Sequence, residues 1–216
     1  MSHRLFPLLF ALLAACALAA GSARAADDGL VAGQDFKLIP EGQLPAGEAG
    51  KVKVVEVFAY WCQHCNRFQP MLSAWLRRQP ADVDFSYVPA AFTPDDVYAR
   101  AYFAAEALDA LPRTHEATYR AIHVDGTVSQ RGASAQDGIG FYAGLGLDRA
   151  AVAEAMDAPG TIAEVTKAHQ FAKAAGVQST PTIIVNGRYR VIARSYEDMI
   201  RITDLLVARE RAAAAP

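Results

Sequence analysis

Two cysteines three residues apart, Cys62 and Cys65, lie where a β-branched run ends and a helical pattern begins. The run is KVKVVEVFAY at 51–60, and its near-continuous apolar character is typical of a strand covered on both faces. Apolar side chains then recur at helical spacing along one face: Cys65, Phe68, Leu72, Trp75 and Leu76. A second strand-like run, VDFSYV, follows at 83–88. Residues 51–88 therefore predict a β-α-β unit with a right-handed crossover.

The rest of the chain predicts a helical block followed by a return to strands. Residues 95 to about 176 are rich in alanine and punctuated by Gly and Pro. They predict five helices, at about 95–110, 113–123, 134–144, 148–156 and 161–175. Asn186-Gly187 then lies between two short apolar runs, which predicts a β-hairpin. Ser195 predicts the N-cap of a last helix, and we expect 211–216 to be a frayed tail.

The first 25 residues are typical of a cleavable export signal. Arg4 precedes an apolar run that is too short for a membrane-spanning helix, and ARA at 23–25 has the small residues that signal peptidase recognises. We therefore expect a signal peptide at 1–25 and one mature domain at 26–216. Cys16 leaves a less favoured alternative open, because LAAC ending at this cysteine resembles a lipobox and would make it a lipid anchor.

Charge and cysteine content narrow the function of the mature domain. It has 19 basic and 23 acidic side chains, net −4, which does not favour binding to nucleic acid or to an anionic membrane surface. Export predicts a compartment that permits disulfides. Only Cys62 and Cys65 remain after the signal is removed, and a bridge between such close neighbours constrains little chain. Redox chemistry explains the pair better than structural stabilisation.

The position of the pair predicts a division of roles. Cys62 falls at a helix N-terminus, where free N–H groups and the helix dipole favour the thiolate that attacks disulfides. Cys65 falls on the apolar face, so we expect Cys62 to attack and Cys65 to resolve the mixed disulfide. A zinc site is the alternative, but it needs four ligands, and the histidines lack ligand spacing: His64, His115, His123 and His169. We therefore expect no metal and no bound cofactor.

Two segments resemble the DsbA family of thiol–disulfide oxidoreductases. FAYWCQHC at 58–65 is similar to its active-site segment, and STPTIIVNGRY at 179–189 is similar to its cis-proline strand and hairpin. The resemblance spans nearly the whole mature chain. It implies an α/β, thioredoxin-like fold with an inserted all-helical subdomain at about 95–176. Gln63 replaces the proline usual in the family, which leaves the redox potential open, while His64 is kept.

The resemblance also assigns supporting residues. His64 would stabilise the Cys62 thiolate, although by itself it would be an exposed residue on a first helical turn. Pro181 would be cis and face the cysteines, leaving the Thr180 backbone free to pair with substrate; a proline that opens an edge strand is the alternative. Glu56 would be a buried acid that exchanges protons behind the cysteines, or else a strand-end carboxylate that reaches solvent. The next strand offers no lysine as its partner.

The expected activity is donation of the Cys62–Cys65 disulfide to unfolded exported proteins in the periplasm by a monomer. The resemblance implies a membrane quinone-linked protein of the DsbB type as the reoxidant. A disulfide isomerase or reductase is the nearest alternative, although isomerases carry an N-terminal dimerisation domain, and only about 25 mature residues precede the first long strand. A holdase or metal carrier without turnover is the other alternative. Tyr60 and Trp61 fit either core aromatics or an apolar substrate-binding patch.

Overall fold

The computed structural model describes residues 28–91, 93 and 95–214, so the predicted signal peptide and Cys16 lie outside the described residues. Five strands form one sheet: β1 Phe36–Leu38, β2 Val52–Phe58, β3 Val83–Pro89, β4 Thr182–Val185 and β5 Tyr189–Val191. The helices of the described part are α1 Gln63–Leu76, α2 Val97–Ala107, α3 Leu111–His123, α4 Ala135–Gly144, α5 Arg149–Asp157, α6 Pro159–Ala174 and α7 Tyr196–Ala214. None of these helices is long and apolar enough to span a bilayer.

The sheet has the strand order β1-β5-β4-β2-β3. β2 pairs in parallel with β3 and antiparallel with β4, which makes it an interior strand, as its apolar run predicts. β4 and β5 form the predicted hairpin around Asn186 and Gly187. Both turn residues have positive φ, at 50° and 67°, and this is the geometry for which Asn-Gly is favoured.

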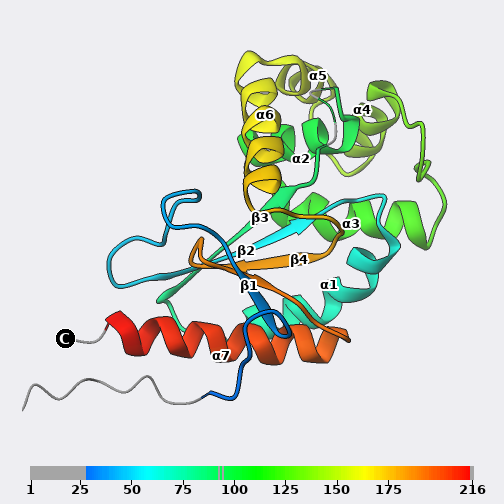
Figure 1. Ribbon diagram of the computed structural model, residues 1–216. Helices are drawn as coiled ribbons and strands as arrows, with labels where there is room; N and C mark the ends of the chain where they lie inside the picture. Colours follow the sequence, from blue (N-terminus) through cyan, green and yellow to red (C-terminus); the bar gives the residue numbers. More distant parts are fainter. Residues whose placement is uncertain (1–27, 92, 94, 215–216) are drawn as a thin grey trace, which may run out of the picture.

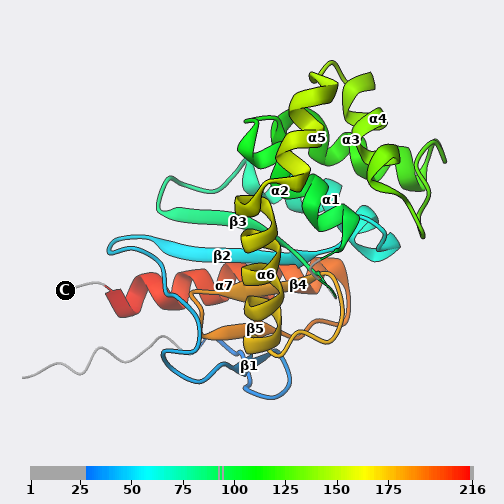
Figure 2. The same cartoon turned by 90° about the horizontal axis from the view of Figure 1, so that it is seen from above.

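Helices cover both faces of the sheet. α1 and α7 pack on one face, around a core that includes Val54, Leu72 and Leu206. α6 and α2 lie against the other face, around Val55 and Val57. Figure 1 shows α7 below the sheet and α6 above it, and Figure 2 shows α6 crossing in front of the strands with α7 behind them. The thioredoxin-like fold with a helical insertion is therefore confirmed.

Helices α2 to α6 stand between β3 and β4 and form the insertion (Figure 1). They lie within a few residues of the five helices expected from the sequence. α2, α4 and α5 share an apolar core of their own, built largely from alanines and a few larger side chains such as Tyr142 and Met156. The N-terminus of each of these three helices is capped by a side chain that accepts a hydrogen bond from a backbone N–H of the first turn. The capping residues are Asp96, Ser134 and Asp148. Local sequence therefore suffices to start these helices.

The C-terminal segment corrects one expectation. Residues 211–214 are not a frayed tail, because α7 continues to Ala214. Arg211 donates two hydrogen bonds to the Asp82 carboxylate, one of them 2.8 Å long. The neighbouring Glu210 is buried and accepts a hydrogen bond from Arg188 at 3.2 Å. These polar contacts with residues far away in sequence hold the last turn, and they were not visible in the local pattern.

Candidate active site

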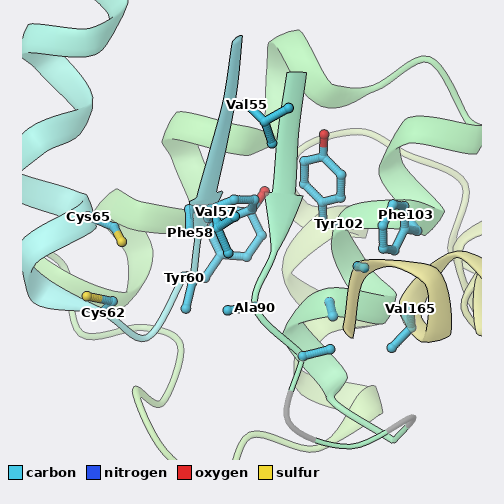
Figure 3. Close-up of a cluster of buried hydrophobic side chains, with 14 of the residues drawn as sticks. Val55, Val57, Phe58, Tyr60, Cys62, Cys65, Ala90, Tyr102, Phe103 and Val165 are labelled. Atoms are coloured by element: carbon cyan, nitrogen blue, oxygen red, sulfur yellow. The ribbon is translucent and has the colours of Figure 1, made fainter. Parts of the chain in front are cut away.

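The two cysteines lie together at the start of α1, directly after β2 (Figure 3). Cys62 is the N-cap residue, with extended backbone angles, and the residue as a whole is 7% exposed. Cys65 is 0% exposed and lies on the same buried face of α1 as Phe68 and Leu72. Both are free thiols in this structure. Of the two, Cys62 lines a surface cavity, and Cys65 does not.

The surroundings of the two thiols give them opposite acidities. The pKa of Cys62 is lowered to about 5, chiefly because the Cys65 thiol donates a hydrogen bond to it. The Thr180 hydroxyl and the backbone N–H groups of Cys65 and His64 add to this effect, and together they outweigh the opposing effect of burial. Burial raises the pKa of Cys65 far above its usual range. Cys62 is therefore the group that forms a thiolate at neutral pH.

A loop distant in sequence closes the site. The Thr180–Pro181 peptide bond is cis, as the resemblance implied, and directly precedes β4. The Sγ of Cys62 lies 3.3 Å from the carbonyl oxygen of Thr180. The structure thus brings Cys62, Thr180 and Pro181 into one cluster, and its sheet order explains how: β4 lies next to β2, whose end leads into α1.

Glu56 is an acid in the middle of the buried strand β2. Its side chain is 0% exposed, and neither carboxylate oxygen has a hydrogen-bond partner among the described residues. Burial, with a further contribution from the charge of Cys62, raises its pKa to about 8. The alternative in which this carboxylate reaches solvent is therefore wrong, because β2 is an interior strand with helices on both sides. Its neighbour in β3 is Tyr87, whose hydroxyl accepts a 2.9 Å hydrogen bond from Gln69.

His64 and Gln63 are both exposed on the first turn of α1. The Nδ1 atom of His64 lies 3.0 Å from the hydroxyl of Tyr196, the first residue of α7. The Tyr196 ring also packs on Phe68, with 5.6 Å between ring centroids. The sequence analysis did not single out Tyr196. His64 and Tyr196 are 132 positions apart, and no local sequence pattern relates them.

The two aromatic residues before Cys62 have different environments. Tyr60 is a core residue: its side chain is buried, and its hydroxyl lies 2.9 Å from Nδ1 of His115 on α3. Trp61 is half-buried, and its carbonyl accepts a 2.8 Å hydrogen bond from the side chain of Gln130. The core interpretation therefore holds for Tyr60, whereas Trp61 lies at the surface beside the reactive thiol.

A cavity of about 480 Å³ opens beside Cys62. Its walls come from the active-site loop, the segment after β3, the C-terminal half of α6 and the loop before Pro181. The lining residues are Trp61, Cys62, Ala90, Ala91, His169, Ala172, Lys173, Val177, Gln178, Ser179 and Thr180. The sequence analysis did not predict that residues of α6 line this cavity, because nothing in the sequence of the insertion relates that helix to the cysteines.

The described residues include no group of three or more His, Cys, Asp or Glu side chains that could hold a metal ion. The histidines make other contacts instead. For example, Nε2 of His123 lies 2.7 Å from the Tyr60 carbonyl oxygen. The zinc alternative therefore has no candidate ligand set in this part of the chain.

Comparisons with known proteins agree with this site. A family profile described as Thioredoxin matches residues 46–204. The thiol:disulfide interchange protein DsbA of Azotobacter vinelandii is 32% identical, over 84% of this chain and 85% of the relative. The DsbA of Pseudomonas aeruginosa strain PAO1 is 32% identical over 96% and 97%. The crystal structure of the oxidoreductase DsbA from Xylella fastidiosa superposes with a TM-score of 0.80 and 42% identity, covering 85% of this chain and 98% of that one. The chain belongs to the DsbA family of thiol:disulfide oxidoreductases.

Proposed function

We propose that this oxidoreductase works as a donor, giving a Cys62–Cys65 disulfide to unfolded exported proteins. The observation that carries the proposal is the acidity of Cys62, whose pKa is lowered to about 5. A stabilised thiolate favours the reduced pair, so the oxidised pair gives up its disulfide readily. A reductase needs the opposite balance, since its dithiol must be the less favoured state.

The proposed exchange runs in two displacements. A substrate thiolate attacks Sγ of Cys62, the Cys62–Cys65 bond breaks, and the sulfur of Cys65 leaves and takes up a proton. A second substrate thiolate then attacks the substrate sulfur of the mixed disulfide, and Cys62 leaves as a thiolate. Two electrons pass from the substrate thiols to the cysteine pair, and the substrate gains one disulfide. The low pKa of Cys62 makes it the better leaving group in the second displacement.

Glu56 is proposed to supply the proton that Cys65 needs. With a pKa raised to about 8, its carboxyl group is protonated at neutral pH. Burial raises the pKa of Cys65 strongly, and the ionised form of Glu56 would raise it further, so Cys65 accepts a proton readily once it leaves as a thiolate. Glu56 therefore acts as a donor during oxidation of substrate and as an acceptor when the pair is reoxidised.

Substrate binding is assigned to the loop before β4 and the cavity beside Cys62. Thr180 lines this cavity and contacts Cys62, so an extended peptide next to Thr180 and Pro181 would hold its own cysteine at the reactive sulfur. The half-buried Trp61 and the methyl groups of Ala90 and Ala91 offer an apolar surface to unfolded chains.

The cellular setting is part of the same proposal. The signal-peptide pattern supports export to the periplasm, and the relatives' shared description as thiol:disulfide interchange proteins supports protein substrates. A membrane quinone-linked protein of the DsbB type would restore the disulfide after each turnover. The cysteine pair is itself the redox centre, so the proposed reaction needs no bound cofactor, and a monomer suffices for it.

Chemical unfolding of both redox forms tests the direction of the reaction. We expect the reduced protein to be more stable than the oxidised one at pH 7. The pKa of Cys62 is lowered from 9.0 in the unfolded state to about 5 in the folded state, so the stabilisation is fully present above pH 9 and is lost as pH falls toward 5. From pH 5 to pH 7, the free energy of unfolding of the reduced form should increase by about 2 kcal/mol relative to that of the oxidised form. An oxidised form that is more stable at pH 7 would instead support the reductase alternative.

His64 has a smaller predicted effect. An imidazole on the first turn of α1 would favour the Cys62 thiolate only when it is protonated, and His64 is exposed, so solvent would screen that charge. We expect His64→Ala to raise the pKa of Cys62 by up to about half a unit and to make the disulfide a weaker oxidant. Ultraviolet absorbance of the thiolate against pH measures the first effect, and equilibrium with glutathione the second. Gln63→Ala is the matched control, and an equal shift in both variants would remove the special role of the histidine.

A further inference from the structure

One wall of the cavity beside Cys62 carries positive charge. Helix α6 contributes His169, Ala172 and Lys173 to this wall. Ala172 and Lys173 lie three and four positions after His169, so their side chains are on the same side of the helix as its ring. The Lys173 side chain is exposed and makes no ion pair with any described residue. None of the described residues that line the cavity is acidic. Among the described residues, the ammonium group thus has no acidic partner at the edge of a largely apolar cavity.

The imidazole of His169, on the same wall, has a fixed orientation. Nδ1 of His169 lies 2.7 Å from the carbonyl oxygen of Ala91, in the segment that follows β3. A carbonyl oxygen only accepts hydrogen bonds, so Nδ1 carries the hydrogen and Nε2 is the remaining polar atom of the ring. The Ala91 contact joins α6 to the segment after β3, which also lines the cavity. His169 and Lys173, the α6 rim, therefore form a polar edge in which the ring of His169 is held in place and the side chain of Lys173 is exposed.

We propose that the α6 rim recognises an acidic side chain in the protein segment that is oxidised at Cys62. This inference rests on the proposed function and adds a preference within it. Charge complementarity supports the choice: a carboxylate would meet the ammonium group of Lys173 with no competing acid on the described walls. Nε2 of His169 would donate to the same carboxylate only when the ring carries a second proton. The effect falls mainly on the rate of encounter and on discrimination between substrate segments.

Lys173 also has a purely structural explanation, because it lies in the last turn of α6, where a positive charge interacts favourably with the helix dipole. The two explanations predict different results. A dipole effect changes the stability of the protein and affects every substrate equally. Recognition changes the ratio of rates between substrates that differ in charge.

The test uses reduced single-cysteine peptides and the oxidised full-length mature protein. Each set of peptides is identical except for one residue, Glu, Gln or Lys, placed at successive positions on either side of the cysteine. At one or more positions, the Glu peptide should react about two- to fivefold faster than the Gln peptide, the range expected for a partly exposed ion pair. The Lys peptide should be slower than both, and added salt should bring the three rates together.

Variants of α6 assign the effect. Lys173→Ala should remove the preference for Glu, and Lys173→Glu should reverse it. Lys167→Glu makes the same charge change on the same helix at a residue that does not line the cavity, so it should retain the preference. If Lys173→Glu fails to fold, Lys173→Ala and the salt series still show whether Lys173 causes the preference for Glu peptides.

Two results would count against the inference in different ways. Equal rates for Glu and Gln peptides at every position, with normal oxidation of both, would overturn the α6 rim proposal and leave the proposed function standing. A preference for Glu that survives in Lys173→Ala would also overturn it. Failure to oxidise any peptide would overturn the proposed function itself, and the inference with it.

Discussion

Cys62→Ala is expected to abolish disulfide exchange, while Cys65→Ala leaves a protein that accumulates as mixed disulfides with its substrates. Cys62 is the only one of the two that lines the cavity beside the active site, and its pKa is lowered to about 5. Cys65 is 0% exposed, so an outside protein cannot reach it. Without Cys65, nothing within the protein attacks the mixed disulfide at Cys62, and the adduct persists. Non-reducing gels of cells that express each variant would reveal the adducts.

The Cys65→Ala variant should show one further change. The Cys65 thiol is the first cause of the low Cys62 pKa, so its removal should raise that pKa and slow attack at neutral pH. Adduct formation in purified protein is therefore best measured up to about pH 9, where even an unassisted thiol is largely ionised. The double variant serves as control. Adducts that accumulate with Cys62→Ala rather than Cys65→Ala would show that the roles of the two cysteines had been exchanged.

Glu56→Gln should stabilise the folded protein by about 3 kcal/mol at pH 7. The pKa of Glu56 is raised from 4.5 to about 8 in the folded state, so folding favours the protonated form. The stability that this group contributes is fully present below pH 4.5 and is lost as pH rises toward 8. Glutamine has nearly the shape of the protonated acid and does not ionise. The variant should therefore match the wild type below pH 4.5 and exceed it at pH 7.

Urea unfolding at several pH values measures this difference. Glu154→Gln is the matched control, since Glu154 is exposed on α5 and should show no comparable pH dependence. The redox state provides a second comparison. The charge of Cys62 contributes to the raised pKa of Glu56, so the gain from Glu56→Gln should be smaller in the oxidised protein, which has no thiolate. A variant less stable than the wild type at pH 7 would rule out a carboxyl group that is buried without partners.

The same variant should slow the exchange reaction. If Glu56 supplies the proton that Cys65 takes up, its removal affects the step in which the Cys65 sulfur leaves. Increased stability combined with slower exchange is the expected pattern for a residue retained for function at a cost in stability.

The sequence alone determined the parts of this protein that depend on neighbouring residues. The apolar run in β2, the helical spacing in α1 and the Asn-Gly turn between β4 and β5 each act over a few positions, and all three elements formed where they were expected. The position of Cys62 at a helix N-terminus followed from the same local pattern. Its thiolate is stabilised partly by backbone N–H groups of that first turn, as the pattern predicts.

Only the tertiary structure decided how these elements meet. The sheet order places β4 beside β2, which buries Glu56 and brings Thr180 to the reactive sulfur. Packing of α7 against α1 sets Tyr196 beside His64. The position of α6 builds one wall of the cavity next to Cys62. Burial and long-range contacts depend on the relative placement of whole elements, whereas turns, caps and periodicity depend on adjacent residues. The reactive pair could therefore be found from local sequence, and Glu56 was named as its acid only through the family resemblance. The cavity could not be found from sequence.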